Sequence, residues 1–118
     1  MNYNVEGVNN MKLSDYKLIY VACKFGGNKE NIKLCEEFIK ELIKEDKRNG
    51  IVGKIYFSPL NAFGWLYDET EYQEGLNWTL RMLTHCDELY VTPGWEDSRG
   101  VNQEIAIATY LGIPIRYI

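Results

Sequence analysis

The glycine-rich turn at residues 94–100 holds the residue types in this sequence that could do chemistry. It follows a strand-like apolar run at 88–92 and precedes a helix-like run at 105–111. In open α/β sheets, ligands bind at the carboxyl ends of strands, against the amino termini of helices. The turn is therefore a predicted ligand site. Its candidate ligand-binding residues are Gly94, Trp95, Ser98, Arg99 and Gly100.

Glu104 is the candidate catalytic residue. The neighbouring positions Val101, Ile105, Ala108 and Leu111 are apolar, so a helix here turns Glu104 toward its buried side. A carboxylate on an apolar face near the start of a helix is costly unless it is paired or used. A structural glutamate that is satisfied by nearby backbone amides explains the spacing equally well.

A second turn follows another apolar run, at residues 17–23. Its residues Gly26, Gly27 and Asn28 could present backbone amides to a phosphate, with Lys24 or Lys29 nearby. A plain strand-to-helix turn is the alternative. Neither turn contains Gly-x-x-x-x-Gly-Lys-Ser/Thr or Gly-x-Gly-x-x-Gly, so the sequence does not support an ATPase or a classical dinucleotide-binding site.

Aromatic residues are concentrated in one part of the chain, between residues 63 and 95. They include Phe63, Trp65, Tyr67, Tyr72, Trp78 and Trp95. Trp65 is expected in a loop and Trp95 in a turn, where a core role is less natural. An aromatic loop over a polar turn suits stacking on a flat base, but an interface between subunits favours the same residues.

Short apolar runs alternate with helical stripes along the chain. Strands are expected at 17–23, 54–58, 88–92 and 114–118, and helices from a cap at Asn28 to about Lys47, at 72–86 and at 105–111. A long aromatic loop is expected at 60–71, and an arm at 1–15. Such alternation implies a parallel sheet with right-handed crossovers. We therefore expect residues 16–118 to form a single three-layer, doubly wound, Rossmann-like α/β domain.

Composition narrows the possible partners. The 118 residues suffice for one domain, and a hydrophobic fraction of 46% excludes disorder. The net charge is −4 and the lysines are dispersed among glutamates, which argues against a nucleic-acid polymer as partner. There is no apolar stretch of membrane-spanning length and the start of the chain is polar, so we expect no membrane association and no signal peptide.

The cysteines indicate neither a metal site nor a cofactor. Cys23, Cys35 and Cys86 form no Cys-x-x-Cys pair, and His85 has no cluster to join. A structural zinc site is therefore not expected, and no cofactor is implied. An odd number of cysteines favours a reducing compartment, which predicts a cytoplasmic protein.

Several short segments together carry a resemblance to a known family. They are Tyr20-Val21-Ala22, Gly26-Gly27, Ser58-Pro59, residues 86–91, and residues 94–100 with Glu104 and Ala108. Over residues 17–118 the chain resembles a family of small uncharacterised bacterial and phage proteins. That family is itself similar to the nucleoside 2-deoxyribosyltransferases and the 2'-deoxynucleoside 5'-phosphate N-hydrolases.

The resemblance implies roles for individual residues. In those enzymes a Ser or Asp, a Gly and a Glu form the site, and Ser98, Gly100 and Glu104 match their spacing. Glu104 would attack C1' of the sugar or stabilise the oxocarbenium ion as the base departs, as carboxylates do in retaining glycosidases. Ser98 would help to hold a phosphate. A neighbouring subunit completes the pocket in such enzymes, which implies a homodimer or a higher homo-oligomer.

The chain also departs from those enzymes. Their Asp on the helix before the penultimate strand has no counterpart in clear register, since that stretch holds Glu74 and Asn77. The N-hydrolases carry Ser and Arg ahead of the first Gly pair, where this chain has Cys23, Lys24 and Phe25. A general acid and an anion clamp are thus missing from the expected places, and loss of a general acid alone costs roughly 10²–10⁴-fold in rate.

Three hypotheses follow. The first is an enzyme that cleaves or exchanges the N-glycosidic bond of a nucleoside or nucleotide, with Glu104 as nucleophile. The second is a non-catalytic binder that sequesters or senses a nucleotide-derived signal, for example an ADP-ribose derivative in a phage anti-defence setting. The third is a structural homo-oligomer without a ligand.

Overall fold

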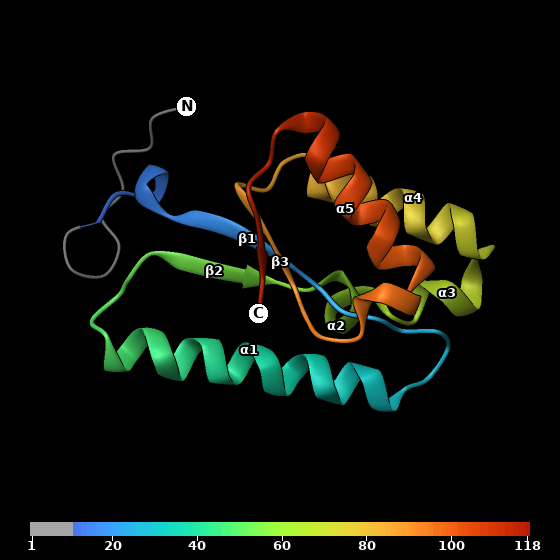
Figure 1. Cartoon of the computed structure of the whole chain (residues 1–118), viewed down its shortest axis with the longest axis horizontal. Helices are drawn as coiled ribbons and strands as arrows, with labels where there is room; N and C mark the ends of the chain where they lie inside the picture. Colours follow the sequence, from blue (N-terminus) through green and yellow to red (C-terminus); the bar gives the residue numbers. More distant parts are fainter. Residues whose placement is uncertain (1–10) are drawn as a thin grey trace.

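The protein is built on a four-stranded parallel β-sheet. The computed structural model describes residues 11–118. The strands are β1 (Lys17–Ala22), β2 (Lys54–Phe57), β3 (Glu88–Val91) and β4 (Ile115–Tyr117). Their order across the sheet is β2-β1-β3-β4, and every pairing is parallel (Figure 1).

Helices cover both faces of this sheet. They are α1 (Glu30–Arg48), α2 (Pro59–Phe63), α3 (Leu66–Glu69), α4 (Tyr72–Leu83) and α5 (Arg99–Leu111), with short 3₁₀ turns η2 (Leu13–Asp15) and η3 (Trp95–Asp97). Helix α1 lies on one face, whereas α4 and α5 pack together on the other (Figure 1). The expected three-layer Rossmann-like fold is confirmed. No helix within residues 11–118 is long and apolar enough to cross a membrane.

Strand β1 is central because it is paired on both edges and covered on both faces. Residues 19–22 are almost completely buried, which explains the continuous apolar run in the sequence. Tyr20 and Ala22 point toward α4 and α5, opposite Leu89 and Val91 of β3. The main core lies on this side of the sheet; its buried members are Tyr20, Ala22, Leu83, Cys86, Leu89, Val91, Val101 and Ala108.

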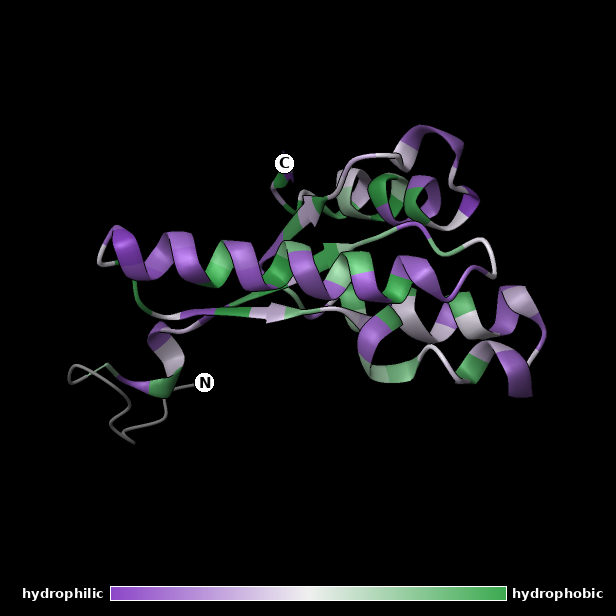
Figure 2. Ribbon diagram, turned by 90° about the horizontal axis from the view of Figure 1, so that it is seen from below, coloured by the Kyte–Doolittle hydropathy of each residue, from purple (hydrophilic) through white to green (hydrophobic). Residues whose placement is uncertain are grey.

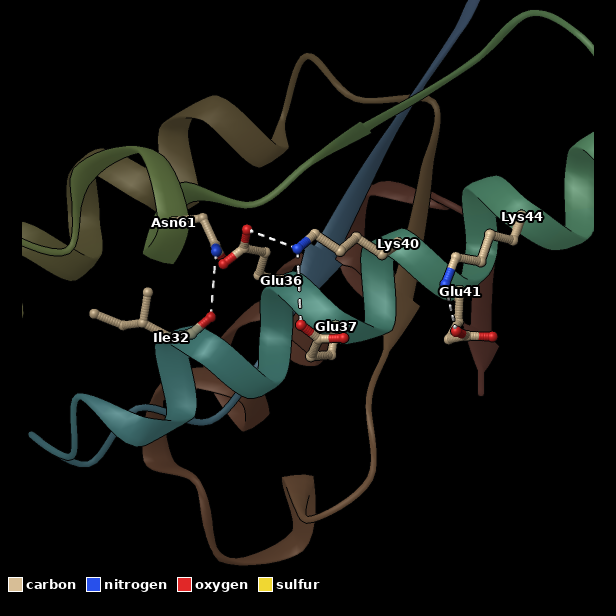
Figure 3. A network of polar contacts seen from close by, with 7 residues as sticks. All are labelled: Ile32, Glu36, Glu37, Lys40, Glu41, Lys44 and Asn61. Atoms are coloured by element: carbon tan, nitrogen blue, oxygen red, sulfur yellow. Dashed lines mark hydrogen bonds and ion pairs between the residues drawn. The ribbon is translucent and has the colours of Figure 1, made fainter.

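Helix α1 presents a solvated outer surface. Figure 2 shows mostly hydrophilic residues along this helix, interrupted by apolar ones. Lysine–glutamate pairs one turn apart lie on it, such as Lys40 with Glu36 and Lys44 with Glu41, each at 3.3 Å (Figure 3). Exposed pairs of this kind contribute little stability, roughly 0–1 kcal/mol each. Cys35 is the residue of α1 that is fully buried.

The segment expected to be a long loop at 60–71 instead forms α2 and α3, so that expectation was wrong. Ser58 caps α2, because its hydroxyl accepts the N–H of Asn61, and Pro59 occupies the first helical turn. Both residues favour a helix start. Trp65 lies directly between the two short helices.

Two helix starts also differ from expectation. Helix α5 begins at Arg99, six residues before the expected 105, because the Ser98 hydroxyl accepts the N–H of Val101 at 3.2 Å and caps it. Glu104 therefore lies in the second turn of α5 and not near its start. Helix α1 begins at Glu30, and the expected cap Asn28 accepts the Glu30 N–H at 3.0 Å.

Other boundaries also moved. Helix α4 ends at Leu83, where 86 was expected. Of the expected arm at 1–15, residues 1–10 lie outside the described part of the chain. Residues 13–15 form the turn η2.

The layered core gives a test of stability with a matched control. Leu83 is fully buried, whereas Leu34 on α1 is 54% exposed. We expect Leu83→Ala to lower the free energy of unfolding by about 2–5 kcal/mol through lost burial and cavity formation. Leu34→Ala should change it by less than about 0.5 kcal/mol. Urea denaturation of the two variants measures both, and equal losses would contradict this assignment of the core.

Candidate functional site

A cleft opens where the chain direction across the sheet reverses. From β1 the chain moves outward through α1 to β2, whereas β3 and β4 lie on the other side of β1. The segments that leave β1 and β3 therefore diverge, and ligands of open α/β sheets bind at such a switch point. The cleft here has a volume of about 960 Å³, and residues 24–29 and 97–99 contribute to its walls. We call it the outer cleft.

One wall is the segment of residues 24–29, which we call the cleft loop. Gly26 and Gly27 have positive φ angles of 56° and 76°, which favour glycine. A Cβ atom added to either would meet no atom within 4 Å, so their backbone is open to an incoming group. The loop is held from within, since the Phe25 carbonyl accepts the Asn28 N–H and the Asn31 side-chain amide, both at 2.9 Å.

The opposite wall is the start of α5. The Asn102 side-chain amide donates to the carbonyls of Trp95, Glu96 and Ser98 at 2.8–3.2 Å. These hydrogen bonds hold the turn that positions Ser98 in the wall of the cleft. Sequence reasoning did not single out Asn102, although an Asn four residues after a capping residue such as Ser98 is a signal for such bonding.

Positive charge prevails at the outer cleft. Its lining includes the cations Lys24, Lys29 and Arg99 and the carboxylates Asp68 and Asp97. This local excess of cations contrasts with the net charge of −4 of the whole chain. An anion is therefore the expected partner for these side chains.

Gly94 makes room for one of these cations. It has a φ angle of 88°, and a Cβ atom there would lie 3.0 Å from the Lys24 ammonium nitrogen. The Lys24 side chain thus crosses from the cleft loop to the end of β3. Any larger residue at position 94 would displace it.

Aromatic side chains form the third wall. Tyr67 stacks on Tyr72 with ring centroids 5.6 Å apart, and the ring centroid of Phe25 lies 5.8 Å from that of Tyr67. Arg99 lies 5.4 Å from the centre of the Tyr72 ring and donates to Gln73 at 2.8 Å. Trp65 is 61% exposed, so a large flat surface faces the outer cleft.

Glu104 lies in a separate small space of about 40 Å³, which we call the inner chamber. Its carboxyl group is buried and hydrogen-bonded to the Tyr20 hydroxyl. Burial raises the pKa of Glu104 to about 8, and the bond from Tyr20 opposes that rise. At neutral pH the group is therefore mainly a neutral acid, able to donate a proton but poorly suited to attack carbon.

Tyr67 and Tyr72 lie between the two spaces, because they line both the outer cleft and the inner chamber, as do Phe25 and Ser98. The Tyr72 hydroxyl accepts a hydrogen bond from the backbone N–H of Gly100. A Cβ atom at Gly100 would lie 2.8 Å from that hydroxyl oxygen, so the close contact depends on glycine. Glu104 does not line the outer cleft, so a ligand there meets the residues that line both spaces before it meets Glu104.

The structure divides the predicted site residues among three places. The outer cleft is lined by Gly26, Gly27, Asn28, Trp65, Ser98 and Arg99. The inner chamber is lined by Ser98, Gly100 and Glu104. Gly94 and Trp95 lie outside both linings, and Trp95 packs on Tyr117 with ring centroids 5.2 Å apart.

Three tyrosines and a disulfide were missed from the sequence as site features. The sequence predicts only core or loop positions for Tyr20, Tyr67 and Tyr72, because residue spacing does not reveal where a hydroxyl group points. Cys23 and Cys35 form a disulfide. An odd number of cysteines does not exclude such a pair, since Cys86 is left over as a buried thiol. The signal was a cysteine at the end of a strand followed by one on the apolar stripe of the next helix.

The family of the chain is established by its sequence. The family model described as Domain of unknown function (DUF4406) matches residues 17–117. The chain belongs to this family. A search of curated proteins found no match. For this DUF4406 protein, the expected membership of an uncharacterised family is confirmed, whereas its kinship with deoxyribosyltransferases stays a prediction.

The raised pKa of Glu104 predicts how the stability of this DUF4406 protein depends on pH. In the folded chain Glu104 keeps its proton up to about pH 8, whereas its ordinary pKa is 4.5. Between these values unfolding releases the proton, so rising pH favours the unfolded state, by up to about 1.4 kcal/mol per pH unit. Below pH 4.5 and above pH 8 this dependence vanishes.

The neutral variant Glu104→Gln isolates this effect from that of other groups. We expect the free energy of unfolding of Glu104→Gln, minus that of the wild type, to increase from pH 5 to pH 8. Denaturant titrations at several pH values measure the difference. A difference that stays constant, or falls, with pH would show that Glu104 is ionised in the folded protein.

Proposed function

We propose that the outer cleft binds a nucleoside phosphate or a related nucleotide derivative. The observation that carries the proposal is that cations, an open glycine turn and an exposed indole ring line one cleft. Lys24 and Lys29 flank Gly26-Gly27, and Trp65 lies in the lining of the same cleft. Phosphate groups favour cations and free backbone amides, whereas bases favour aromatic faces.

The dimensions of the outer cleft fit this class of ligand. Small-molecule sites commonly occupy about 300–1,000 Å³, and the cleft has about 960 Å³. We infer that the phosphate lies between the cleft loop and Arg99, and the base against Trp65 or Tyr67. The sugar would then lie against the tyrosines in front of Glu104.

A second candidate function, cleavage or exchange of the N-glycosidic bond, is favoured by Glu104. Glu104 is 7% exposed and its carboxyl group is hydrogen-bonded to a tyrosine. A carboxyl group is costly to bury, which suggests a use. As a neutral acid it suits proton donation to a leaving base better than attack on C1'. Nucleophilic attack would require ionisation, and the tyrosine separation would have to open.

The arrangement supports binding over cleavage as the first proposal. Glu104 does not line the outer cleft, so binding there does not involve it, whereas chemistry at Glu104 requires a ligand to pass the residues that line both spaces. A structural homo-oligomer without a ligand would leave the cations of the cleft unexplained. A homodimer or higher oligomer is compatible with either function and is proposed from the resemblance alone.

Two exposed tryptophans provide a matched test of nucleotide binding. Trp65 lies in the outer cleft and is 61% exposed, whereas Trp78 on α4 is 49% exposed and lies outside its lining. We expect Trp65→Ala to weaken binding by roughly 1–3 kcal/mol, the value of one base–aromatic stack. Trp78→Ala should leave the affinity unchanged.

Isothermal titration calorimetry with a panel of nucleoside 5'-phosphates and ADP-ribose measures these affinities. The variants are compared with the panel member that binds the wild type most tightly. Absence of binding to the whole panel, or equal losses in the two tryptophan variants, would refute the proposal.

Cleavage is tested with Glu104→Gln, which keeps the shape and hydrogen-bonding capacity of the side chain. If the wild type releases a base, the variant should release none, while its affinity stays within about 1–3 kcal/mol of the wild type. Chromatography of the products measures release. A variant that still releases base would exclude Glu104 from the chemistry, and a wild type that binds without release would leave the binder as the function.

A further inference from the structure

The cleft loop is tied to the fold by the disulfide between Cys23 and Cys35. Cys23 is half-buried and directly follows β1, and Cys35 is fully buried on α1. Their Cα atoms are 5.9 Å apart, within the usual range for a disulfide. The bond encloses residues 24–34, which contain Lys24, the two glycines and Lys29. It therefore fixes one wall of the outer cleft at both ends.

A chain of polar contacts surrounds Cys35. The Cys35 sulfur lies 3.3 Å from the Ser58 hydroxyl oxygen. That hydroxyl donates to the Asn61 side-chain oxygen at 2.9 Å and accepts the Asn61 N–H. A hydroxyl has one proton, and here that proton serves Asn61. A disulfide sulfur carries none, so the contact between Cys35 and Ser58 lacks a proton while the disulfide is intact.

The same contact becomes a hydrogen bond when Cys35 is a thiol. Its S–H can then donate to Ser58, which still donates to Asn61. The side-chain amide of Asn61 in turn donates to the Ile32 carbonyl at 3.2 Å (Figure 3). The chain of hydrogen bonds from Cys35 to Ile32 can thus be complete only in the reduced state.

The state of Cys35 changes how α1 is connected to the cleft. The disulfide joins α1 to the end of β1, where the cleft loop begins. Asn61 joins α2 to α1 through the Ile32 carbonyl while the disulfide is intact, and the thiol adds a second link from Cys35 through Ser58 to Asn61. Because α2 leads directly to Trp65, the state of Cys35 bears on the cleft loop and on the segment that carries Trp65.

We propose that Cys23 and Cys35 are a reversible redox pair that controls the order of the cleft loop. The consequence for affinity rests on the proposed nucleotide binding. A thiolate of a dithiol reductant attacks the sulfur of the half-buried Cys23, the Cys23–Cys35 bond breaks, and Cys35 leaves as a thiolate that takes up a proton. The second thiol of the reductant then displaces Cys23 as a thiol, and the reductant leaves as a disulfide.

The oxidised protein is the tighter binder. The disulfide removes conformational freedom from residues 24–34, so less order has to be created on binding. Reduction should weaken nucleotide binding by about tenfold, equivalent to one or two side chains that must be ordered anew. Cys86 takes no part, because burial raises the pKa of its thiol to about 11 and it lies in the main core.

The first experiment needs no ligand. The full-length protein is equilibrated with mixtures of oxidised and reduced dithiothreitol, and its thiols are alkylated and counted by mass spectrometry. Hydrogen–deuterium exchange of residues 24–34 is followed in parallel. Reduction should expose two further thiols and accelerate this exchange in the wild type and in the control Cys86→Ser.

The variant Cys23→Ser should exchange fast under all conditions. Failure of the disulfide to form in folded protein, or exchange that is unaffected by reduction, would overturn the redox pair.

The second experiment compares nucleotide affinity in the two states. The wild type and Cys86→Ser should bind about tenfold more weakly when reduced, and Cys23→Ser should bind weakly with or without reductant. Equal affinities in both states would overturn the proposed control. Absence of binding in both states would contradict the proposed nucleotide binding instead, and the exchange measurement would then decide the redox pair alone.

Discussion

The central position of β1 is the constraint on which the rest of the structure depends. The strand is hydrogen-bonded on both edges and covered on both faces, so its residues 19–22 have no freedom to shift. The residues that follow its carboxyl end therefore start from a fixed position. They are Cys23 with its disulfide, Lys24 and the glycine turn. The same strand holds Tyr20 where its hydroxyl forms a hydrogen bond with the carboxyl group of Glu104. A single buried strand thereby positions groups in both the outer cleft and the inner chamber.

The buried Glu104 shows how burial and chemistry oppose each other here. Transfer of a carboxylate out of water is so costly that the group keeps its proton instead. The hydroxyl of Tyr20 offsets part of that cost, but burial prevails and the pKa rises. In the protonated form Glu104 is a neutral group that is hydrogen-bonded inside the core. Any role as an anion requires water or a positively charged ligand group to reach the chamber first.

The fold was predictable because its determinants are local and periodic. The apolar runs of β1 and β3 and the stripe of α1 specify a parallel sheet between helix layers, whatever the details of the turns. Helix boundaries were less predictable where one residue is compatible both with a turn or strand end and with the cap of a helix. Ser58-Pro59 ends a strand and also begins α2, and Ser98 belongs to a turn and also caps α5. In both cases capping extended helical structure into a segment that composition marked as irregular.

The site was predictable only in part for a different reason. The turns that line the outer cleft are recognisable in the sequence by glycine and polar residues at strand ends, so their residues could be named. The tyrosines could not, because their role depends on long-range contacts. Tyr20 meets Glu104 across 84 positions of the sequence, and Tyr72 meets Gly100 only after α4 and α5 have packed. The pairing of Cys23 with Cys35 likewise requires the β1–α1 geometry.

Under the proposed function, the tyrosines between cleft and chamber set an energetic threshold between binding and chemistry. Moving Tyr72 aside breaks its hydrogen bond from Gly100, its stacking on Tyr67 and its contact with Arg99. Each of these interactions contributes roughly 0.5–1.5 kcal/mol, so opening costs a few kcal/mol. A ligand that only occupies the outer cleft gains nothing from opening and leaves the chamber closed. Under the same proposal, a ligand whose phosphate draws Arg99 away from Tyr72 would weaken one of these contacts on binding, and a ligand of this class is the one expected to bring a sugar to Glu104.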